Sequence, residues 1–475
     1  MLFKSILSRK KNNKVNSSAL AHDTYFNNLR ETEYKRLSEQ GHSYLDYTGG
    51  NLYGLSQIKQ HTETLANSVF GNPHSTNPSS QFATKLVDDA RTKVLEFFNA
   101  EDYFCVFTAN ASGALKIVGE CYPFSPESHL LLFSDNHNSV NGIREYCDKR
   151  GGEYTYVPVH YEDLEIDKAI LEEKLEAFEN KKTKLFAFPG QSNASGVKHD
   201  LTWIEKAHEK GWDVLLDAAA FAPTNILDLQ KIKPDFVAVS FYKIFGYPTG
   251  LGCLLVKKSK FNTLDKQWFA GGTISIVSVG DPNHFLLENH ERFENGTINY
   301  LDIPAIKNGL EYVEKIGMTR INERVNSLIQ YLYGELKQLK HDSGVQQVNL
   351  LGPTDRSRTG GNLIMTFCNP DSSLIPFDLI EAKANEKMIS IRSGCFCNPG
   401  IDETNHCSTI EELKDYFTSR DHGHYFEMTS YLNKLRGSTR ASVGIATIKE
   451  DLDCFIDFVN SLKNKSFVDQ KSIMH

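Results

Sequence analysis

Two apolar runs near the middle of the chain decide the fold. Residues 212–252 read WDVLLDAAAFAPTNILDLQKIKPDFVAVSFYKIFGYPTGLG, and within them WDVLLDAAA and DFVAVSFYK are short apolar stretches bounded by turn or helix signals. Runs of this length and composition predict buried strands. The first run delivers the carboxylate of Asp217 to a strand end. The second delivers Lys243 to another, directly before a turn rich in glycine and proline.

Strand-like and helix-like stretches alternate in the same way over about residues 85–260. Further strands are expected in AEDYFCVFTA, HLLLFSD, EYTYVPV and TKLFAFPG, and helices in SGALKIVGECY and NGIREYCDKR. Strands that alternate with helices predict a mostly parallel sheet covered on both faces. Because ligands of such sheets bind at the carboxyl ends of the strands, the residues that end these runs are the candidates for chemistry.

The rest of the chain predicts a smaller α+β domain. A long helical stretch, AIKNGLEYVEKIGMTRINERVNSLIQYLYGELKQL, is followed by strand-like GGNLIMTFC and MISIRSGCF and by a helix around KEDLDCFIDFVNSLKNK. We expect a large domain over residues 45–310, and a small domain built from residues 1–44 and 311–475. The basic N-terminus MLFKSILSRKKNNK predicts a surface helix, with a weak membrane or organelle address as the alternative.

Composition narrows the class of protein. Of the 475 residues, 40% are hydrophobic and 24% charged, which is typical of a soluble globular protein and excludes a disordered or fibrous chain. The net charge of −8 gives no general attraction to nucleic acid or to an anionic membrane, so we expect neither as a partner. Nine cysteines, an odd number, favour reduced thiols and a cytoplasmic location over a disulfide framework.

Lys243 and Asp217 suit a reaction that needs an amine and an acid. Burial lowers the pKa of a lysine and makes its amine a competent nucleophile, while a carboxylate on the neighbouring strand would hold a pyridinium nitrogen protonated. The stretch TANASG, residues 108–113, lies between a predicted strand and a predicted helix. Its small residues and the helix N-terminus suit a phosphate, although an ordinary helix cap explains the same pattern.

Four motifs carry a resemblance to a known group of enzymes. SFYKIFGYPTGLG, FENGTINYLDIPAI, GNPHS and RSGCFCNPG together resemble the class V aminotransferase group of pyridoxal-phosphate (PLP) enzymes of fold type I. Within it they are most similar to the cysteine-desulfurase-like domain of molybdenum cofactor sulfurases, from about residue 44 to residue 450. The resemblance implies an α/β fold, with a large domain around a mostly parallel seven-stranded sheet, a smaller α+β domain and a homodimer.

The resemblance also implies a set of cofactor residues. Lys243 would hold PLP as a Schiff base, Asp217 would pair with the pyridine nitrogen, and His137 would stack on the ring. The other implied cofactor contacts are Asn110, Ala111 and Ser112 with Ser240 around the phosphate, Thr297 from a second subunit, and Asn193 near the ring oxygen.

On the substrate side, the resemblance implies that Arg440 binds the substrate carboxylate, a pairing that guanidinium groups make with two parallel hydrogen bonds. Cys397 would form the persulfide, and Arg392, which begins its motif, and Asn193 would also face the substrate. The chain departs from desulfurases at two positions. Ala220 stands where they usually carry glutamine, and Tyr242 where they usually carry histidine, which leaves the rate of cysteine turnover open.

Cys395, Cys397 and Cys407 lie close together in the sequence and allow three interpretations. The C-x-C-x9-C spacing is not a usual zinc pattern, so we expect no metal site. Surface thiols without a role are a second interpretation. We favour a nucleophilic cysteine on a mobile loop, with its thiolate stabilised by Arg392. The sequence does not separate Cys397 from Cys395 as the nucleophile.

The predicted activity is that of a cysteine desulfurase. L-Cysteine would give up its sulfur to Cys397 and leave as alanine, and the sulfur would pass to an acceptor protein or to the molybdenum cofactor. Full-length sulfurases carry a further C-terminal domain and this chain ends at His475, so we expect a separate acceptor or another sulfur pathway. The alternatives are a selenocysteine lyase, aminotransferase or epimerase of the same fold, and a non-catalytic sulfur-trafficking protein. The last would gain nothing from keeping Lys243, Asp217, His137 and Arg440 together.

Overall fold

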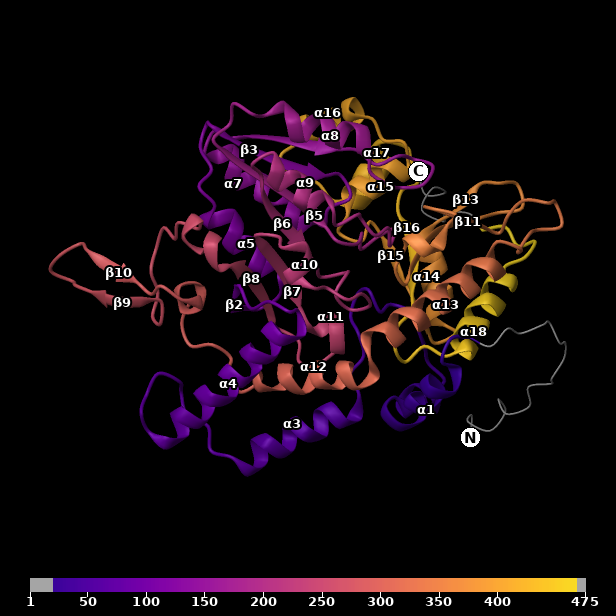
Figure 1. The fold of residues 1–475 in the computed structure, drawn as a ribbon. Helices are drawn as coiled ribbons and strands as arrows, with labels where there is room; N and C mark the ends of the chain where they lie inside the picture. Colours follow the sequence, from indigo (N-terminus) through magenta and orange to yellow (C-terminus); the bar gives the residue numbers. More distant parts are fainter. Residues whose placement is uncertain (1–19, 468–475) are drawn as a thin grey trace.

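A seven-stranded sheet forms the centre of the molecule, shown by a computed structural model that describes residues 20–467 (Figure 1). The strand order is β2-β8-β7-β6-β5-β3-β4, and β8 runs antiparallel to its two neighbours while the other six strands run parallel. This confirms the predicted mostly parallel sheet. The strands are β2 (Tyr103–Thr108), β3 (Ser128–Phe133), β4 (Glu153–Val157), β5 (Thr183–Pro189), β6 (Asp213–Asp217), β7 (Phe236–Ser240) and β8 (Gly252–Lys257).

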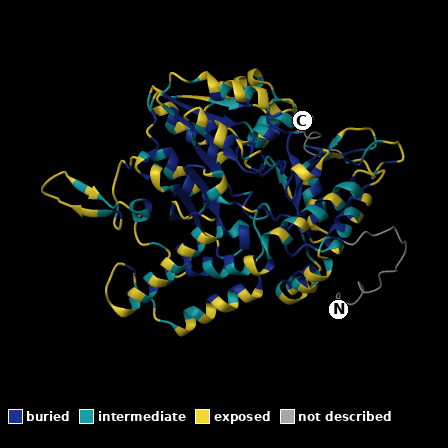
Figure 2. Ribbon diagram, in the orientation of Figure 1, coloured by how far each residue is buried: buried dark blue, intermediate teal, exposed yellow. Residues whose placement is uncertain are grey.

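Both faces of this sheet are buried. Along β3, Leu130 and Leu132 belong to one apolar cluster while Leu131 and Phe133 belong to the other, as the two-residue period of a strand requires. Figure 2 shows the sheet strands as buried and the outer helix faces as exposed. The helices of this part are α3 (Leu55–Asn67), α4 (Pro78–Phe97), α5 (Ala111–Cys121), α6 (Asn138–Asn141), α7 (Ile143–Lys149), α8 (Lys168–Ala177), α9 (Trp203–Glu209), α10 (Leu229–Ile232), α11 (Phe241–Phe245) and α12 (Pro304–Ile316).

A second sheet has the order β11-β12-β16-β15, with β13 also paired to β12. The segment before the large sheet reaches this region, because β1 (Ser43–Tyr44) pairs with β14 (Ile389–Ser390). The elements here are α1 (Asp23–Glu33), α2 (Lys35–Glu39), α13 (Met318–Leu336), β11 (Val348–Leu350), β12 (Asn362–Cys368), β13 (Leu374–Ile375), α14 (Phe377–Asn385), β15 (Arg392–Gly394), α15 (Pro399–Asn405), α16 (Ile410–Thr418), α17 (Tyr425–Tyr431), β16 (Ser438–Ser442) and α18 (Lys449–Asn460). A hairpin of β9 (Ile274–Val277) and β10 (His284–Leu286) projects from the body (Figure 1).

Two local predictions need correction. The run DFVAVSFYK is a strand only as far as Ser240, and Lys243 lies in the short helix α11. Phe241, Ile244 and Phe245 are buried at helical spacing, which explains why the apolar run continues past the strand. The long helical stretch is two helices, α12 and α13, separated at Gly317, whose φ of 93° only glycine adopts readily.

The structure leaves two other predictions untested: the N-terminal helix and the domain boundaries. The expected surface helix at the N-terminus lies outside the described residues. The division into domains at residues 45–310 remains a proposal. Between residues 20 and 467 no helix is long and apolar enough to cross a bilayer.

A substitution at Gly309 tests the packing of α12 against α11, the helix that carries Lys243. A methyl group at Gly309 of α12 would overlap the ring of Phe245 in α11. We therefore expect Gly309→Ala to lower the free energy of unfolding by about 1–3 kcal/mol, through overpacking. The matched control is Gly334→Ala in α13, where nothing lies within 4 Å of the added methyl group. It should raise stability by about 0.5–1 kcal/mol. Urea unfolding of both variants measures the difference, and equal effects would contradict this account.

Candidate active site

A cavity of about 140 Å³ lies where β6, β7 and the N-terminus of α5 meet. This is the carboxyl end of the parallel strands, where the sequence predicts the catalytic residues. Eight of the nine predicted cofactor residues line it: Asn110, Ala111, Ser112, His137, Asn193, Asp217, Ser240 and Lys243. Thr297, the ninth, is exposed in the loop after Phe293 and is not part of this cavity.

One end of the cavity is the start of α5. Asn110 caps this helix by accepting a hydrogen bond from the Gly113 N–H at 3.0 Å, and Ser240 Oγ accepts one from the Ala111 N–H at 2.9 Å. Gly252 of β8 lets the backbone of Asn110 approach closely, because a side chain at Gly252 would overlap it. The start of an eleven-residue helix favours negative charge, so this end suits a phosphate group.

The other walls carry the amine, the acid and the imidazole. Asp217 is the last residue of β6, and its carboxylate accepts a hydrogen bond from the Ala219 N–H at 3.0 Å. Burial lowers the pKa of Lys243, and the charges of Arg440 and Arg392 lower it further, while Asp217 opposes them. Burial also lowers the pKa of His137.

His137 enters the cavity as a neutral ring. Its Nδ1 accepts a hydrogen bond from the Ser139 N–H at 3.1 Å, so that nitrogen carries no proton and Nε2 does. An anion site at a helix start, a carboxylate, a partly desolvated amine and an uncharged aromatic ring are the groups that PLP requires. The residues present therefore fit the cofactor that the resemblance implied.

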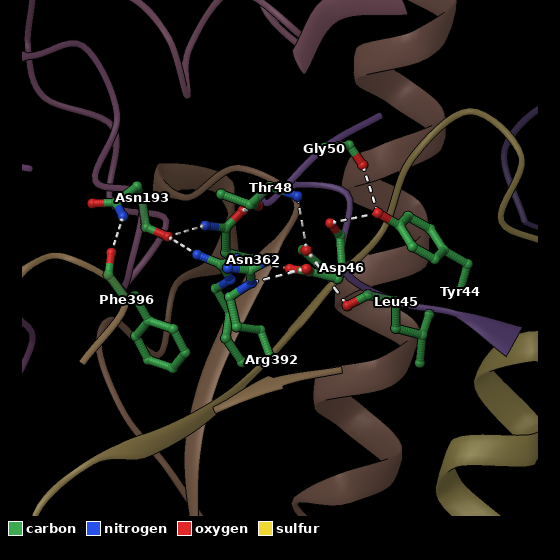
Figure 3. A network of polar contacts seen from close by, with 11 residues as sticks. Tyr44, Leu45, Asp46, Thr48, Gly50, Asn193, Asn362, Arg392 and Phe396 are labelled. Atoms are coloured by element: carbon green, nitrogen blue, oxygen red, sulfur yellow. Dashed lines mark hydrogen bonds and ion pairs between the residues drawn. The ribbon is translucent and has the colours of Figure 1, made fainter. Parts of the chain in front are cut away.

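Of the predicted substrate residues, Asn193 lines this cavity, whereas Arg440 and Arg392 do not. Arg440, on β16, is buried and donates to the carboxylate of Asp46 at 2.8 Å and to the Asn193 carbonyl at 2.7 Å. Arg392, on β15, donates through Nε to the other oxygen of Asp46 at 2.9 Å (Figure 3). Sequence reasoning missed Asp46. The available signal was LDYTGG, an acidic residue between a short strand and a Gly-Gly turn.

The cysteine loop is fastened to the edge of the cavity. The Phe396 carbonyl accepts a hydrogen bond from Asn193 Nδ2 at 2.7 Å, and the Cys397 carbonyl accepts one from the Asn138 N–H at 2.8 Å. Asn398, which is buried, donates to the Asp135 carbonyl at 2.6 Å and to Asn193 Oδ1 at 3.0 Å. Sequence reasoning missed Asn398, and it placed Asn193 against the cofactor without anticipating these bonds to the loop.

The three clustered cysteines differ in their surroundings. Cys397 and Cys407 are exposed, whereas Cys395 is half-buried and its pKa is raised by burial. An exposed thiol at the cavity edge is better placed to exchange a group with an acceptor than a half-buried one. Among residues 20–467, no group of three or more His, Cys, Asp and Glu side chains is arranged to hold a metal ion.

Comparison with known sequences identifies relatives over most of the chain. The profile of the aminotransferase class-V family matches residues 43–455. Molybdenum cofactor sulfurase 3 of Aedes aegypti is 36% identical over 455 residues, which cover 90% of this chain and 57% of the relative. The molybdenum cofactor sulfurase of Arabidopsis thaliana is 34% identical, with 91% of this chain and 57% of the relative covered. The chain thus spans little more than half the length of these relatives.

Solved structures share the fold. A cysteine desulfurase from Thermococcus onnurineus NA1 matches with a TM-score of 0.76 at 24% identity, covering 94% of this chain and 99% of its own. A cysteine desulfurase from Escherichia coli matches with a TM-score of 0.73 at 19% identity, covering 92% and 98%. With the family match and the cavity around Lys243, these findings place the chain in the aminotransferase class-V family, as an enzyme of the α/β fold type whose cofactor is pyridoxal phosphate.

Proposed function

We propose that the chain is a PLP-dependent cysteine desulfurase. It would transfer the sulfur of L-cysteine to Cys397, release alanine, and pass the sulfur to an acceptor protein, with the molybdenum cofactor as the candidate final destination. The observation that carries the proposal is the exposed thiol of Cys397 on a loop that Asn138 and Asn193 fasten to the edge of the cavity containing Lys243.

Lys243, Asp217 and Arg440 would each have a separate role in the reaction. Bound PLP supplies the electron sink that stabilises negative charge at the substrate Cα. The Lys243 amine, whose pKa is lowered by burial, takes the proton from Cα and returns it. Asp217 holds the proton on the pyridine nitrogen, and Arg440 binds the substrate carboxylate.

The sulfur transfer balances without an external oxidant. The Cys397 thiolate attacks the sulfur of the substrate, an S–S bond forms, and the C–S bond breaks. The carbon keeps the electron pair and takes a proton, so L-cysteine and one thiol give alanine and one persulfide. Arg392 lies within electrostatic reach of Cys397.

We further propose that two copies of the chain form a homodimer with shared sites. Eight predicted cofactor residues line the cavity of one chain, while Thr297 is exposed outside it. Thr297 of the partner subunit would close the phosphate end of the cavity.

Lys243→Ala tests the cofactor linkage. We expect the purified wild type to show the visible absorbance of a lysine-linked cofactor, and Lys243→Ala to lose it, because no other amine among residues 20–467 lines the cavity. The matched control is Lys231→Ala, which removes a side chain that is 80% exposed. It should leave the spectrum unchanged. A wild type that binds no PLP would overturn the proposed function.

Cys397→Ala tests the persulfide. We expect it to retain the cofactor spectrum but to lose at least about 100-fold of the alanine and sulfide formed from L-cysteine under reductant, since it lacks the sulfur acceptor. Cys395→Ala, at the half-buried neighbour, is the matched control and should stay active. Full activity of Cys397→Ala, together with loss of activity in Cys395→Ala, would move the nucleophile to Cys395.

Mixing two inactive variants tests the shared site. In a mixed dimer of Lys243→Ala and Thr297→Ala, one site has lost both residues and the other has both. A fully exchanged equimolar mixture should therefore regain up to about a quarter of the wild-type activity. If the mixture stays as inactive as its components while gel filtration shows that subunits have exchanged, Thr297 does not act across the dimer.

A further inference from the structure

Asp46 joins the two arginines of the substrate side into one charged cluster. Its Oδ1 accepts from Arg440 at 2.8 Å and its Oδ2 from Arg392 at 2.9 Å, so each carboxylate oxygen serves one guanidinium (Figure 3). The side chain of Arg440 is 2% exposed and that of Asp46 12%, whereas that of Arg392 is 53% exposed. The cluster therefore has one deeply buried cation, one open cation and a shared anion.

The backbone is shaped to hold this carboxylate. The Gly49 and Gly50 N–H groups donate to the Asp46 carbonyl at 3.0 and 3.2 Å, and the Thr48 N–H donates to Ser442 Oγ at 3.0 Å. A side chain at Gly49 would overlap the Asp46 carboxylate, so only glycine leaves room for it. The LDYTGG turn thus places the Asp46 charge at a fixed point.

The same turn is tied to the helix that carries Lys243. The Asn51 N–H donates to the Tyr242 carbonyl at 3.3 Å, and Asn51 Nδ2 donates to the Ile244 carbonyl at 2.7 Å. The charges of both Arg440 and Arg392 also lower the pKa of Lys243. Thr48 and Asn51 of the turn line a cavity together with Lys243, so the turn that carries Asp46 borders the space in which a substrate attached at Lys243 would lie.

Arg440 keeps donor capacity for a ligand. A guanidinium has five N–H donors, and the bonds to Asp46 and to the Asn193 carbonyl use one on each terminal nitrogen. Its Nε is buried and has no hydrogen-bond partner among the described residues. Buried donors are nearly always paired in folded proteins, so an incoming carboxylate would complete the set.

We propose that Asp46 is a specificity-determining residue: by pairing with both guanidinium groups, it leaves the cluster one net positive charge, which accepts the single carboxylate of an amino acid with an uncharged side chain. This rests on the proposed binding of L-cysteine. Two guanidinium charges and one carboxylate leave a charge of +1, which the substrate carboxylate neutralises. A second acidic group on the substrate would add a negative charge that the cluster cannot neutralise, and Asp46 would repel it.

The test compares two probes that differ only in the second acid, L-alanine and L-aspartate. Dissociation constants are measured on the PLP-loaded protein from the ligand-induced change in visible absorbance and from thermal stabilisation. The wild type should prefer L-alanine. Asp46→Asn raises the cluster charge to +2 and frees Arg392, so the affinity ratio should shift toward L-aspartate by at least about tenfold.

A second substitution separates charge from structure. Asp46→Asn combined with Arg392→Gln returns the charge of the cluster to +1. This double variant should restore the preference for L-alanine, although the ion pairs of Asp46 with Arg392 and Arg440 are lost. A merely structural role for Asp46 predicts that the double variant is worse than either single one. If Asp46→Asn does not fold, Arg392→Gln alone serves: with charge zero, it should weaken both ligands and L-aspartate more.

The matched control is a buried ion pair that shares no residue with the cluster. Asp451 accepts from Arg30 at 2.9 Å, with both side chains buried, so Asp451→Asn should cost comparable stability and leave the ligand ratio unchanged. An unchanged ratio in Asp46→Asn overturns the inference. If the wild type still makes alanine from L-cysteine, the proposed function survives that result. A wild type that makes no alanine, but whose ratio shifts in Asp46→Asn, refutes the desulfurase proposal alone.

Discussion

The site depends on ion pairs that hold the second sheet against the segment following β1. Asp46 precedes Arg392 by 346 residues and Arg440 by 394, and the turn that carries it also bonds to α11, the helix of Lys243. Removing one partner of such a buried pair leaves a charge without compensation, a cost of about 3–5 kcal/mol. These contacts therefore fix how the cavity at the ends of the parallel strands meets the strands that bring the arginines.

The residues at the ends of the parallel strands could be predicted from the sequence more fully than the cluster of Asp46 and its two arginines. Asp217 and the start of α5 follow from local patterns, because a buried strand ends at each and a turn comes next. The sequence predicts Lys243 on a strand, because the five residues of α11 are too few to distinguish the two-residue period of a strand from the 3.6-residue period of a helix. Asp46 could not be paired with its arginines at all, because no periodicity connects positions that far apart. The motif resemblance predicts Arg440 and Cys397 as site residues, but it does not predict Asp46, the carboxylate to which Arg440 donates.

The loop of Cys397 combines firm anchors with a strained backbone. Phe396 and Cys397 both have φ near +55°, a region that costs a non-glycine residue about 1–3 kcal/mol. Hydrogen bonds from Asn193 and Asn138, each worth about 0.5–1.5 kcal/mol, hold the loop in place. The two hydrogen bonds of Asn398 add to these anchors, so hydrogen bonds hold the loop in place against the strain of its backbone.

The charge cluster also links substrate binding to the basicity of Lys243. Burial lowers the pKa of Lys243, and the charges of Arg440 and Arg392 lower it further. Asp46, which is hydrogen-bonded to both arginines, offsets only part of their charge. In the proposed reaction, a substrate carboxylate bound at Arg440 cancels the remaining positive charge, which raises the pKa of Lys243. Lys243 is released from the cofactor only when the substrate takes its place, so the amine is freed in surroundings that make it a stronger base toward the Cα proton. Under this proposal, one interaction, the partial neutralisation of two arginines by Asp46, affects both which substrate carboxylate binds and how strong a base Lys243 is.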